Sequence, residues 1–215
     1  MPKTVRVERS VFAANEDVAT ANRRALEAAG TVAVNIMASP GAGKTTLILA
    51  TAAALGPDVR CGVIEGDIAG DLDARVVEEH GLPVVQVNTG GACHLRADMV
   101  AAALAELPLA HIDVLFIENV GNLVCPAGVL LGEQRKVVVS STSEGHDKPL
   151  KYPAVFREAD AVVVSKWDLA PYVGFEMDAY VDYLRRLNSA VPLFRLSART
   201  GEGMGDWVAW LRKQV

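Results

Sequence analysis

Residues 32–46 read VAVNIMASPGAGKTT, and this stretch decides the fold. A β-branched apolar run, residues 32–38, leads into a glycine-rich loop that ends at Lys44 and opens a helix-forming segment. This order is typical of a phosphate-binding loop, because small residues let backbone N–H groups turn inward around a phosphate. The alternative, a chance glycine-rich turn, is disfavoured by the intact Gly-Lys-Thr-Thr after the strand.

The residues of this loop have separate expected roles. Lys44 supplies a cation for the β- and γ-phosphates, and the Thr45 hydroxyl is a ligand for Mg²⁺. Ala38 replaces the usual first glycine, so the backbone there must adopt angles that suit an L-residue. The predicted nucleotide-binding residues are Ser39, Pro40, Gly41, Ala42, Gly43, Lys44, Thr45 and Thr46.

Outward from the loop, short apolar runs alternate with helical patterns. We predict further strands at residues 59–67, 84–88, 112–118, 136–140, 161–165 and 192–197. Several are apolar nearly throughout, as in parallel strands that helices cover on both faces. The predicted fold is therefore a doubly wound α/β domain with a mostly parallel sheet. Residues 1–30, whose helix-forming pattern stops at Gly30, predict an N-terminal helical arm packed on a P-loop GTPase domain of residues 31–215.

The composition narrows the class of protein. With 215 residues, 51% of them hydrophobic and 22% charged, the chain suits one folded domain. The net charge of −5 argues against a dedicated nucleic-acid binder. Neither an apolar run of about 18 residues nor a signal peptide is apparent, and three cysteines are too few for a disulfide framework. We therefore expect a cytoplasmic protein with neither a membrane nor a nucleic acid as partner.

Acidic residues follow two of the predicted strands. Glu118 ends the run 112–118 and can hold Mg²⁺, while Gly121 can offer an amide to a γ-phosphate. Asp67 and Asp73, near the end of the run 59–67, fit a Mg²⁺ or water-orienting role and a helix-capping role equally well. Glu65 belongs to the same set of candidates.

The catalytic and magnesium assignments follow from these positions. Capping is the better interpretation for Asp71, and no residue stands out as the one that positions the attacking water. The predicted catalytic residues are Lys44, Asp67, Asp73 and Glu118. The predicted Mg²⁺ ligands are Thr45, Asp67 and Glu118.

The run 161–165 leads into SKWD, residues 165–168, which indicates guanine recognition. A carboxylate at Asp168 can accept from the N1–H and N2 amine of guanine, whereas adenine would leave it unpaired. The Lys166 stem can cover the base. The pattern resembles the NKxD element of GTPases with Ser165 in place of Asn, and Ser197-Ala198 resembles their SAK loop. The alternative interpretation of Asp168 is a carboxylate in an exposed loop.

Two further segments carry candidate ligands for a soft metal ion. Cys93 and His94 follow the run 84–88, and Cys125 follows Glu118 closely in sequence. Thiolate and imidazole suit Zn²⁺ or Ni²⁺, and a two-fold dimer could complete a site that is one ligand short. The proximity of Cys125 to Glu118 would make metal affinity depend on the nucleotide. The spacing alone leaves open a chance Cys-His pair, and Cys61, within a strand pattern, is predicted to be core.

These segments together resemble the HypB family, the nickel-insertion GTPases of [NiFe]-hydrogenase maturation. The resemblance rests on SPGAGKTT, GGACHL, ENVGNLVCPAGVLLGE, SEGHDKPLKYPAVFREAD and SKWDL, and it runs from about residue 10 to the C-terminus. It implies slow GTP hydrolysis to GDP and phosphate, a nucleotide-modulated homodimer, and a Ni²⁺/Zn²⁺ site at Cys93, His94 and Cys125. It also implies a HypA-type metallochaperone and the precursor of the hydrogenase large subunit as partners.

Two departures and three alternatives accompany this resemblance. The chain has neither the CxxCGC motif nor the histidine-rich tract of some members, and Ser165 replaces Asn. Nickel storage is therefore not expected. The alternatives are a regulatory GTPase without metal, a urease-type nickel accessory GTPase such as UreG, and a P-loop kinase. The chain lacks the Cys-Pro-His motif of UreG, which disfavours the urease-type GTPase. It also lacks a recognisable acceptor-binding domain, which disfavours the kinase.

Overall fold

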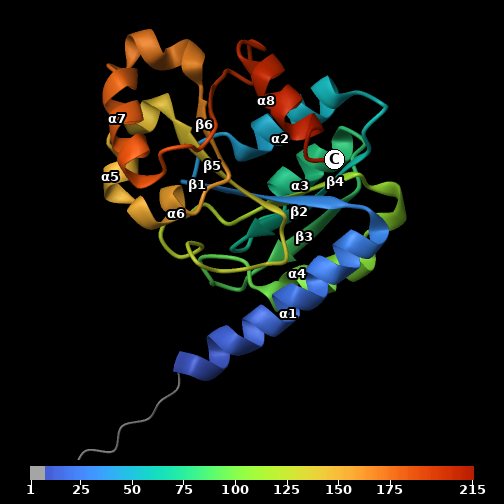
Figure 1. Ribbon diagram of the computed structural model, residues 1–215. Helices are drawn as coiled ribbons and strands as arrows, with labels where there is room; N and C mark the ends of the chain where they lie inside the picture. The colour runs from blue at the N-terminus through green and yellow to red at the C-terminus, as the bar shows by residue number, and fades with distance from the viewer. Residues whose placement is uncertain (1–7) are drawn as a thin grey trace, which may run out of the picture.

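The computed structural model describes residues 8–215 and contains one sheet of seven parallel strands (Figure 1). Their spatial order is β3-β2-β4-β1-β5-β6-β7. The strands are β1 (Val32–Ala38), β2 (Cys61–Asp67), β3 (Val84–Asn88), β4 (Val114–Glu118), β5 (Arg135–Ser141), β6 (Ala161–Ser165) and β7 (Leu193–Arg195). Chain order reverses on either side of β1, so the doubly wound α/β prediction is confirmed.

Eight α-helices and three 3-10 turns connect the strands within the described residues. The helices are α1 (Glu8–Ala29), α2 (Lys44–Leu55), α3 (Leu72–Glu79), α4 (Ala97–Glu106), α5 (Lys148–Lys151), α6 (Pro153–Arg157), α7 (Met177–Leu187) and α8 (Met204–Arg212). The 3-10 turns are η1 (Leu109–His111), η2 (Thr142–Glu144) and η3 (Trp167–Tyr172). None of these helices combines the length and the apolar character that crossing a bilayer requires.

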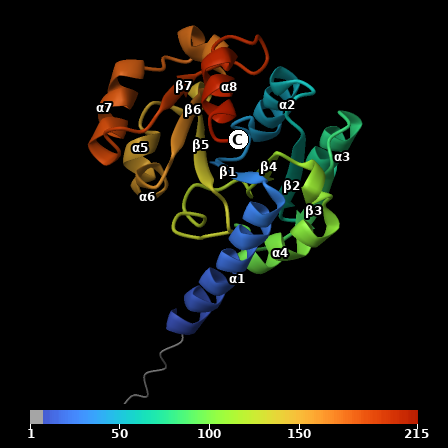
Figure 2. The ribbon, with the colours of Figure 1, turned by 45° about the vertical axis from the view of Figure 1, so that its right-hand side comes forward.

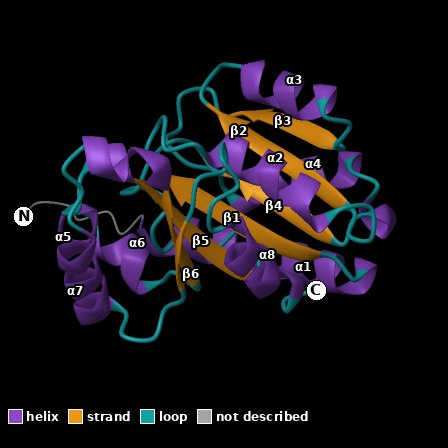
Figure 3. Ribbon diagram, turned by 90° about the horizontal axis from the view of Figure 1, so that it is seen from above, coloured by secondary structure: helices purple, strands orange, loops and turns teal. Residues whose placement is uncertain are grey.

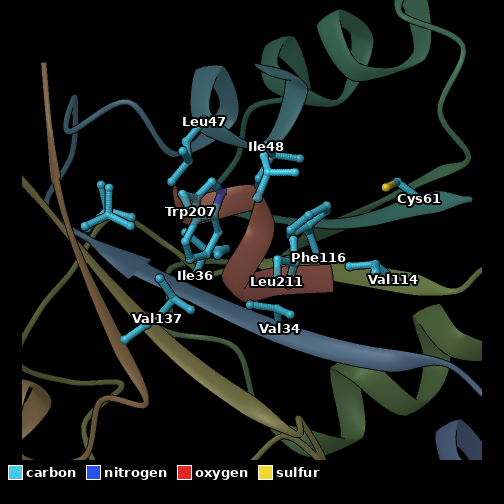
Figure 4. Packing of buried hydrophobic residues seen from close by; sticks show 14 of the residues in the cluster. Val34, Ile36, Leu47, Ile48, Cys61, Val114, Phe116, Val137, Trp207 and Leu211 are labelled. Atoms are coloured by element: carbon cyan, nitrogen blue, oxygen red, sulfur yellow. The ribbon is translucent and has the colours of Figure 1, made fainter. Parts of the chain in front are cut away.

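Alternate residues of the strands enter different cores, as the two-residue period of a strand dictates. On one face, Ile36 packs with Trp207 of α8 and Leu47 of α2 in a cluster seen in Figure 4. Figure 3 shows α2 and α8 lying over this side of the sheet. The opposite face carries two clusters, one with α1 and α4 and one with α6 and α7. Burial on both faces explains why the central strands are mainly apolar.

Helix α1 covers Glu8–Ala29, and residues 1–7 of the predicted arm lie outside the described residues. Residues 8–29 contain neither glycine nor proline, and the helix ends where Gly30 takes a φ of 71°. Figures 1 and 2 show it running alongside α4. Leu26 is fully buried there, and the Asn22 amide donates to the carbonyls of Ala97 and Leu131 at 2.8 and 2.9 Å. The division at residue 30 stays a prediction.

All seven predicted strands are present, with differences only at their ends. The strand predicted from residue 59 begins at Cys61, and the strand predicted from residue 112 begins at Val114. The preceding residues are held by a local contact instead, since the Arg60 guanidinium forms an ion pair of 2.6 Å with Asp113. Cys61 is buried in the core, as predicted, and burial raises the pKa of its thiol to about 12.

Candidate functional site: a phosphate loop beside a thiol cluster

The phosphate loop occupies the turn between β1 and α2. Gly41 and Gly43 take φ values of 73° and 92°, a region that L side chains rarely adopt, so both glycines are required by the backbone. Ala38 is instead the last residue of β1, where an extended backbone suits alanine. The helix α2 begins at Lys44 and directs its N-terminal N–H groups toward the loop, which favours an anion there.

Carboxylates gather behind this loop. One carboxylate oxygen each of Glu65, Asp73 and Glu118 lies within 4.8 Å of the other two. The Thr45 hydroxyl donates to Glu118 Oε1 at 2.9 Å, and Lys44 Nζ lies 3.5 Å from the same oxygen. Oxygen ligands of this kind are what Mg²⁺ prefers, so the donor set fits that ion.

The two buried carboxylates of this cluster, Glu65 and Glu118, are only partly compensated by the charge of Lys44. Glu65 and Glu118 expose only 2% and 1% of their surface, and the Oε2 atom of each has no hydrogen-bond partner among the described residues. Burial, followed by the charge of Glu118, raises the pKa of Glu65 to about 10. Burial also raises the pKa of Glu118, although Lys44 opposes this shift. The pair therefore holds a proton unless a cation replaces it.

The two remaining acids of this region are engaged elsewhere. Asp67 Oδ1 accepts from the N–H groups of Ala69 and Gly70 at 2.9 and 2.7 Å, and these bonds lower its pKa. The structure thus places Asp67 outside the carboxylate cluster, and its predicted Mg²⁺ role stays a prediction. Asp71 occupies the N-cap position of α3 without a capping hydrogen bond, and its carboxylate pairs with Arg75 at 2.6 Å.

The SKWD segment lies against the phosphate loop. The Ser165 hydroxyl donates to the Ala42 carbonyl at 2.7 Å, and Lys166 Nζ donates to the Gly41 carbonyl at 2.6 Å. Lys166 has a φ of 55°, the one non-glycine residue with positive φ among residues 8–215. Such a conformation requires support, and the Thr142 hydroxyl supplies it by donating to the Lys166 carbonyl at 2.7 Å.

A cavity of about 320 Å³ is lined by both the SKWD segment and the phosphate loop. Asp168 is half-buried at its wall and forms no hydrogen bond through its side chain to any described residue, so both oxygens can accept. The cavity is lined by Ala42, Gly43, Thr46, Leu47, Ser165, Lys166, Asp168, Leu169, Ser197, Ala198 and Arg199. Every predicted base-contacting residue therefore lines one cavity.

Two thiols and an imidazole converge beyond the carboxyl ends of β3 and β4. Ligand atoms of Cys93, His94 and Cys125 all lie within 4.8 Å of one another, and Cys93 Sγ lies 3.7 Å from His94 Nδ1. The neighbouring Cys125 thiol raises the pKa of Cys93. Burial, then Arg96, lowers the pKa of His94, which favours the neutral imidazole that binds metals.

The segment after Glu118 touches the phosphate loop. A side chain on Gly121 would place its Cβ 2.9 Å from Pro40 Cγ and 3.1 Å from Pro40 Cα, so only glycine allows this approach. Gly121 therefore lies where its backbone can respond to whatever the loop binds. Its predicted contact with a γ-phosphate stays a prediction.

Sequence analysis predicted no role for Lys148. Its Nζ atom donates to the Ser39 hydroxyl at 2.9 Å and lies 2.8 Å from Glu144 Oε1. Lys148 thus brings a nearly buried cation to the phosphate loop from η2 and α5, remote in sequence. Only the fold could reveal it, because lysine in a polar loop is normally solvated.

A second cavity, of about 430 Å³, lies at the other edge of the sheet. It is bounded by the end of α2, the start of β2 and the end of α3, with Arg60, His80 and His111 among its lining residues. None of the predicted site residues reaches it.

Comparison with known proteins matches most of the chain, including the segment that carries the phosphate loop. The family model described as "CobW/HypB/UreG, nucleotide-binding domain" matches residues 32–195. The hydrogenase maturation factor HypB of Azotobacter vinelandii is 46% identical over 212 residues, which are 99% of this chain and 70% of that protein. This chain belongs to the HypB family. The predicted resemblance to HypB proteins is therefore confirmed.

Solved HypB structures share the fold over nearly the whole chain. The crystal structure of HypB from Archaeoglobus fulgidus has a TM-score of 0.87 and 38% identity, and covers 94% of this chain and 98% of its own. The structure of HypB from Helicobacter pylori in complex with nickel has a TM-score of 0.89 and 35% identity. It covers 93% of this chain and 94% of its own.

Proposed function

We propose that the chain is a GTP-hydrolysing nickel metallochaperone of [NiFe]-hydrogenase maturation. The observation that carries this proposal is the convergence of Cys93, His94 and Cys125 within 4.8 Å, on segments adjoining a phosphate loop. Membership of a family whose relatives are named hydrogenase maturation factors supports it. So does the likeness to a HypB structure that holds nickel.

GTP is the proposed substrate. Asp168 reads the guanine edge, Lys44 binds the β- and γ-phosphates, and Thr45 and Glu118 face the position where Mg²⁺ would neutralise phosphate charge. Water attacks the γ-phosphorus, the bond to the β–γ bridging oxygen breaks, and GDP and phosphate leave. We expect slow hydrolysis, because the sequence offers no evident arginine finger or catalytic glutamine.

Nickel or zinc is the proposed cargo of the thiol cluster. Three side chains leave one position of a tetrahedral site open, and a second copy of the chain could fill it across a two-fold axis. We propose that the triphosphate draws two copies together and alters this site. Hydrolysis then favours handing over the metal, with a HypA-type metallochaperone and the hydrogenase large-subunit precursor as the proposed partners in the cytoplasm.

Equilibrium dialysis with Ni²⁺ and Zn²⁺ tests the cargo. Cys93→Ala should weaken binding of either ion while leaving the far-ultraviolet circular dichroism unchanged. Cys61→Ala is the matched control, because Cys61 is buried in the core away from the cluster, and it should bind metal as the unaltered chain does. Equal metal binding by Cys93→Ala and the unaltered chain would remove this site. GTP binding without any metal binding would favour the regulatory GTPase instead.

A further inference from the structure

The loop that carries Cys93 and His94 is anchored at Leu95. This residue is fully buried, and its N–H donates to the side-chain oxygen of Asn119 at 3.0 Å. Its side chain packs against Gly66 of β2, where an added Cβ would lie 2.8 Å from Leu95 Cδ1 and 3.0 Å from the Glu118 carbonyl. Leu95 therefore lies against the ends of both strands that carry the buried carboxylates.

Both the oxygen and the nitrogen of the Asn119 side-chain amide form hydrogen bonds that hold Leu95 in place. Its Oδ1 atom accepts from the N–H groups of Leu95 and Val120, both at 3.0 Å. Its Nδ2 atom donates to Asn35 Oδ1 at 3.2 Å, and Asn35 in turn donates to Glu133 Oε1 at 3.2 Å. Asn119 is 1% exposed, so water does not compete for these bonds. The bond to Asn35 fixes the orientation of the Asn119 amide, so that its oxygen faces the loop that carries Cys93 and His94.

The same segment also shapes the loop of Cys125. Asn122 Oδ1 accepts from the N–H groups of Val124 and Cys125 at 2.7 and 3.2 Å. Between the two asparagines lies Gly121, in contact with Pro40 of the phosphate loop. A segment that begins at Glu118 thus touches the carboxylate cluster, the phosphate loop and both arms of the thiol cluster.

We propose that Asn119 is the positioning residue that makes metal affinity depend on the bound nucleotide. It binds neither ligand itself. It follows Glu118 directly, so a displacement of the β4 end toward a triphosphate moves its side chain, and the bond to Leu95 carries that movement to Cys93 and His94. Both sites are needed for this coupling, so the inference rests on the function proposed above.

The test measures nickel affinity in two nucleotide states. A chromophoric chelator competes for Ni²⁺ with the full chain loaded with Mg²⁺ and either GDP or a non-hydrolysable GTP analogue. In the unaltered chain the two dissociation constants should differ by about 5- to 150-fold, the usual range of allosteric coupling. In Asn119→Ala they should agree within about twofold. Asn35→Ala removes the bond from Asn119 Nδ2 and the bond of Asn35 to Glu133 but leaves the bond from Leu95 to Asn119, so it should give an intermediate ratio.

Asn188→Ala is the matched control. The Asn188 amide also donates to backbone carbonyls, those of Phe156, Arg157 and Ala159, but after α7 and away from both sites. This variant should keep the ratio of the unaltered chain. If Asn119→Ala keeps that ratio as well, the inference is overturned while the proposed function stands. If Asn119→Ala does not fold, an unchanged ratio in Asn35→Ala overturns it. Absence of nickel binding in the unaltered chain overturns both.

Discussion

Glu65 and Glu118 occupy paired positions on the neighbouring parallel strands β2 and β4, and both are almost fully buried. Two carboxylates at one register position repel each other when both are ionised, so the nucleotide-free chain keeps a proton there. Among residues 8–215, Lys44 is the cation that forms an ion pair with these carboxylates, at 3.5 Å from Glu118 Oε1. The carboxylate pair can therefore bind an additional positive charge in place of this proton.

The first prediction concerns the pH dependence of stability. The pKa of Glu65 rises from 4.5 to about 10 on folding, so between these values the folded state binds a proton that the unfolded state lacks. The free energy of unfolding should therefore fall as pH rises, by up to about 1.4 kcal/mol per pH unit. Urea denaturation at pH 6 and pH 8, without Mg²⁺ or nucleotide, measures this slope.

Glu65→Gln removes the titrating group and keeps its shape. The variant should show a flatter dependence of unfolding free energy on pH and a higher stability at pH 8. Glu79→Gln, at the exposed end of α3, serves as the control and should retain the original slope. An unchanged slope in Glu65→Gln would mean that the proton resides on another group.

Asp168→Asn should weaken GTP binding by about 10- to 100-fold and leave ATP binding nearly unchanged. The reason is that an amide nitrogen cannot accept from guanine N1–H, whereas adenine gains nothing from the carboxylate. Competition with a fluorescent guanine nucleotide measures both affinities. Asp182→Asn, on the exposed side of α7, is the control. A constant GTP-to-ATP ratio would show that the base is read elsewhere.

Lys44→Ala should reduce the affinity for GTP by roughly 30-fold or more and abolish turnover, because the phosphates lose their buried cation. Phosphate release assays and nucleotide titrations measure the two effects. Lys213→Ala, exposed at the end of α8, should behave as the unaltered chain. Turnover that survives in Lys44→Ala would indicate that the phosphates bind outside this loop.

Ser165→Ala should weaken GTP and GDP alike, by about fivefold, since the buried Ala42 carbonyl loses its one side-chain donor. The equal effect on both nucleotides distinguishes a displaced phosphate loop from a lost γ-phosphate contact. Dissociation kinetics of fluorescent GDP and GTP analogues provide the comparison, with the exposed Ser189→Ala as control. Unchanged affinities would show that the loop holds its shape without this bond.

The sheet was predictable from the sequence because the central strands are buried on both faces and are therefore mainly apolar, with Glu65 and Glu118 near their carboxyl ends. The phosphate loop was predictable because Gly41 and Gly43 need positive φ. The membership of the carboxylate cluster could not be predicted, because the two-residue period of a strand places Glu65 and Asp67 on the same face of β2. The two acids differ because the turn after β2 holds the Asp67 carboxylate, which accepts hydrogen bonds from two backbone N–H groups there.

Ser165 illustrates a second limit of the sequence. The motif suggests only that an amide has been lost. In the structure the shorter hydroxyl still reaches the Ala42 carbonyl, since β6 ends directly beside the phosphate loop. Likewise, no pattern in the chain links Asn119 to Leu95 or Lys148 to Ser39, because such contacts depend on how segments remote in sequence are brought together.

The packing of α1 has a practical consequence for anyone trimming this chain to a minimal catalytic fragment. A fragment that starts at residue 31 would lack Leu26, which is fully buried in the core, and would expose the apolar surface around it. The carbonyls of Ala97 and Leu131 would also lose the hydrogen bonds that they accept from the Asn22 amide. Such a fragment would be expected to precipitate on expression. The Ala97 carbonyl that loses its donor would also lie only three residues after His94, close in sequence to the thiol and imidazole ligands.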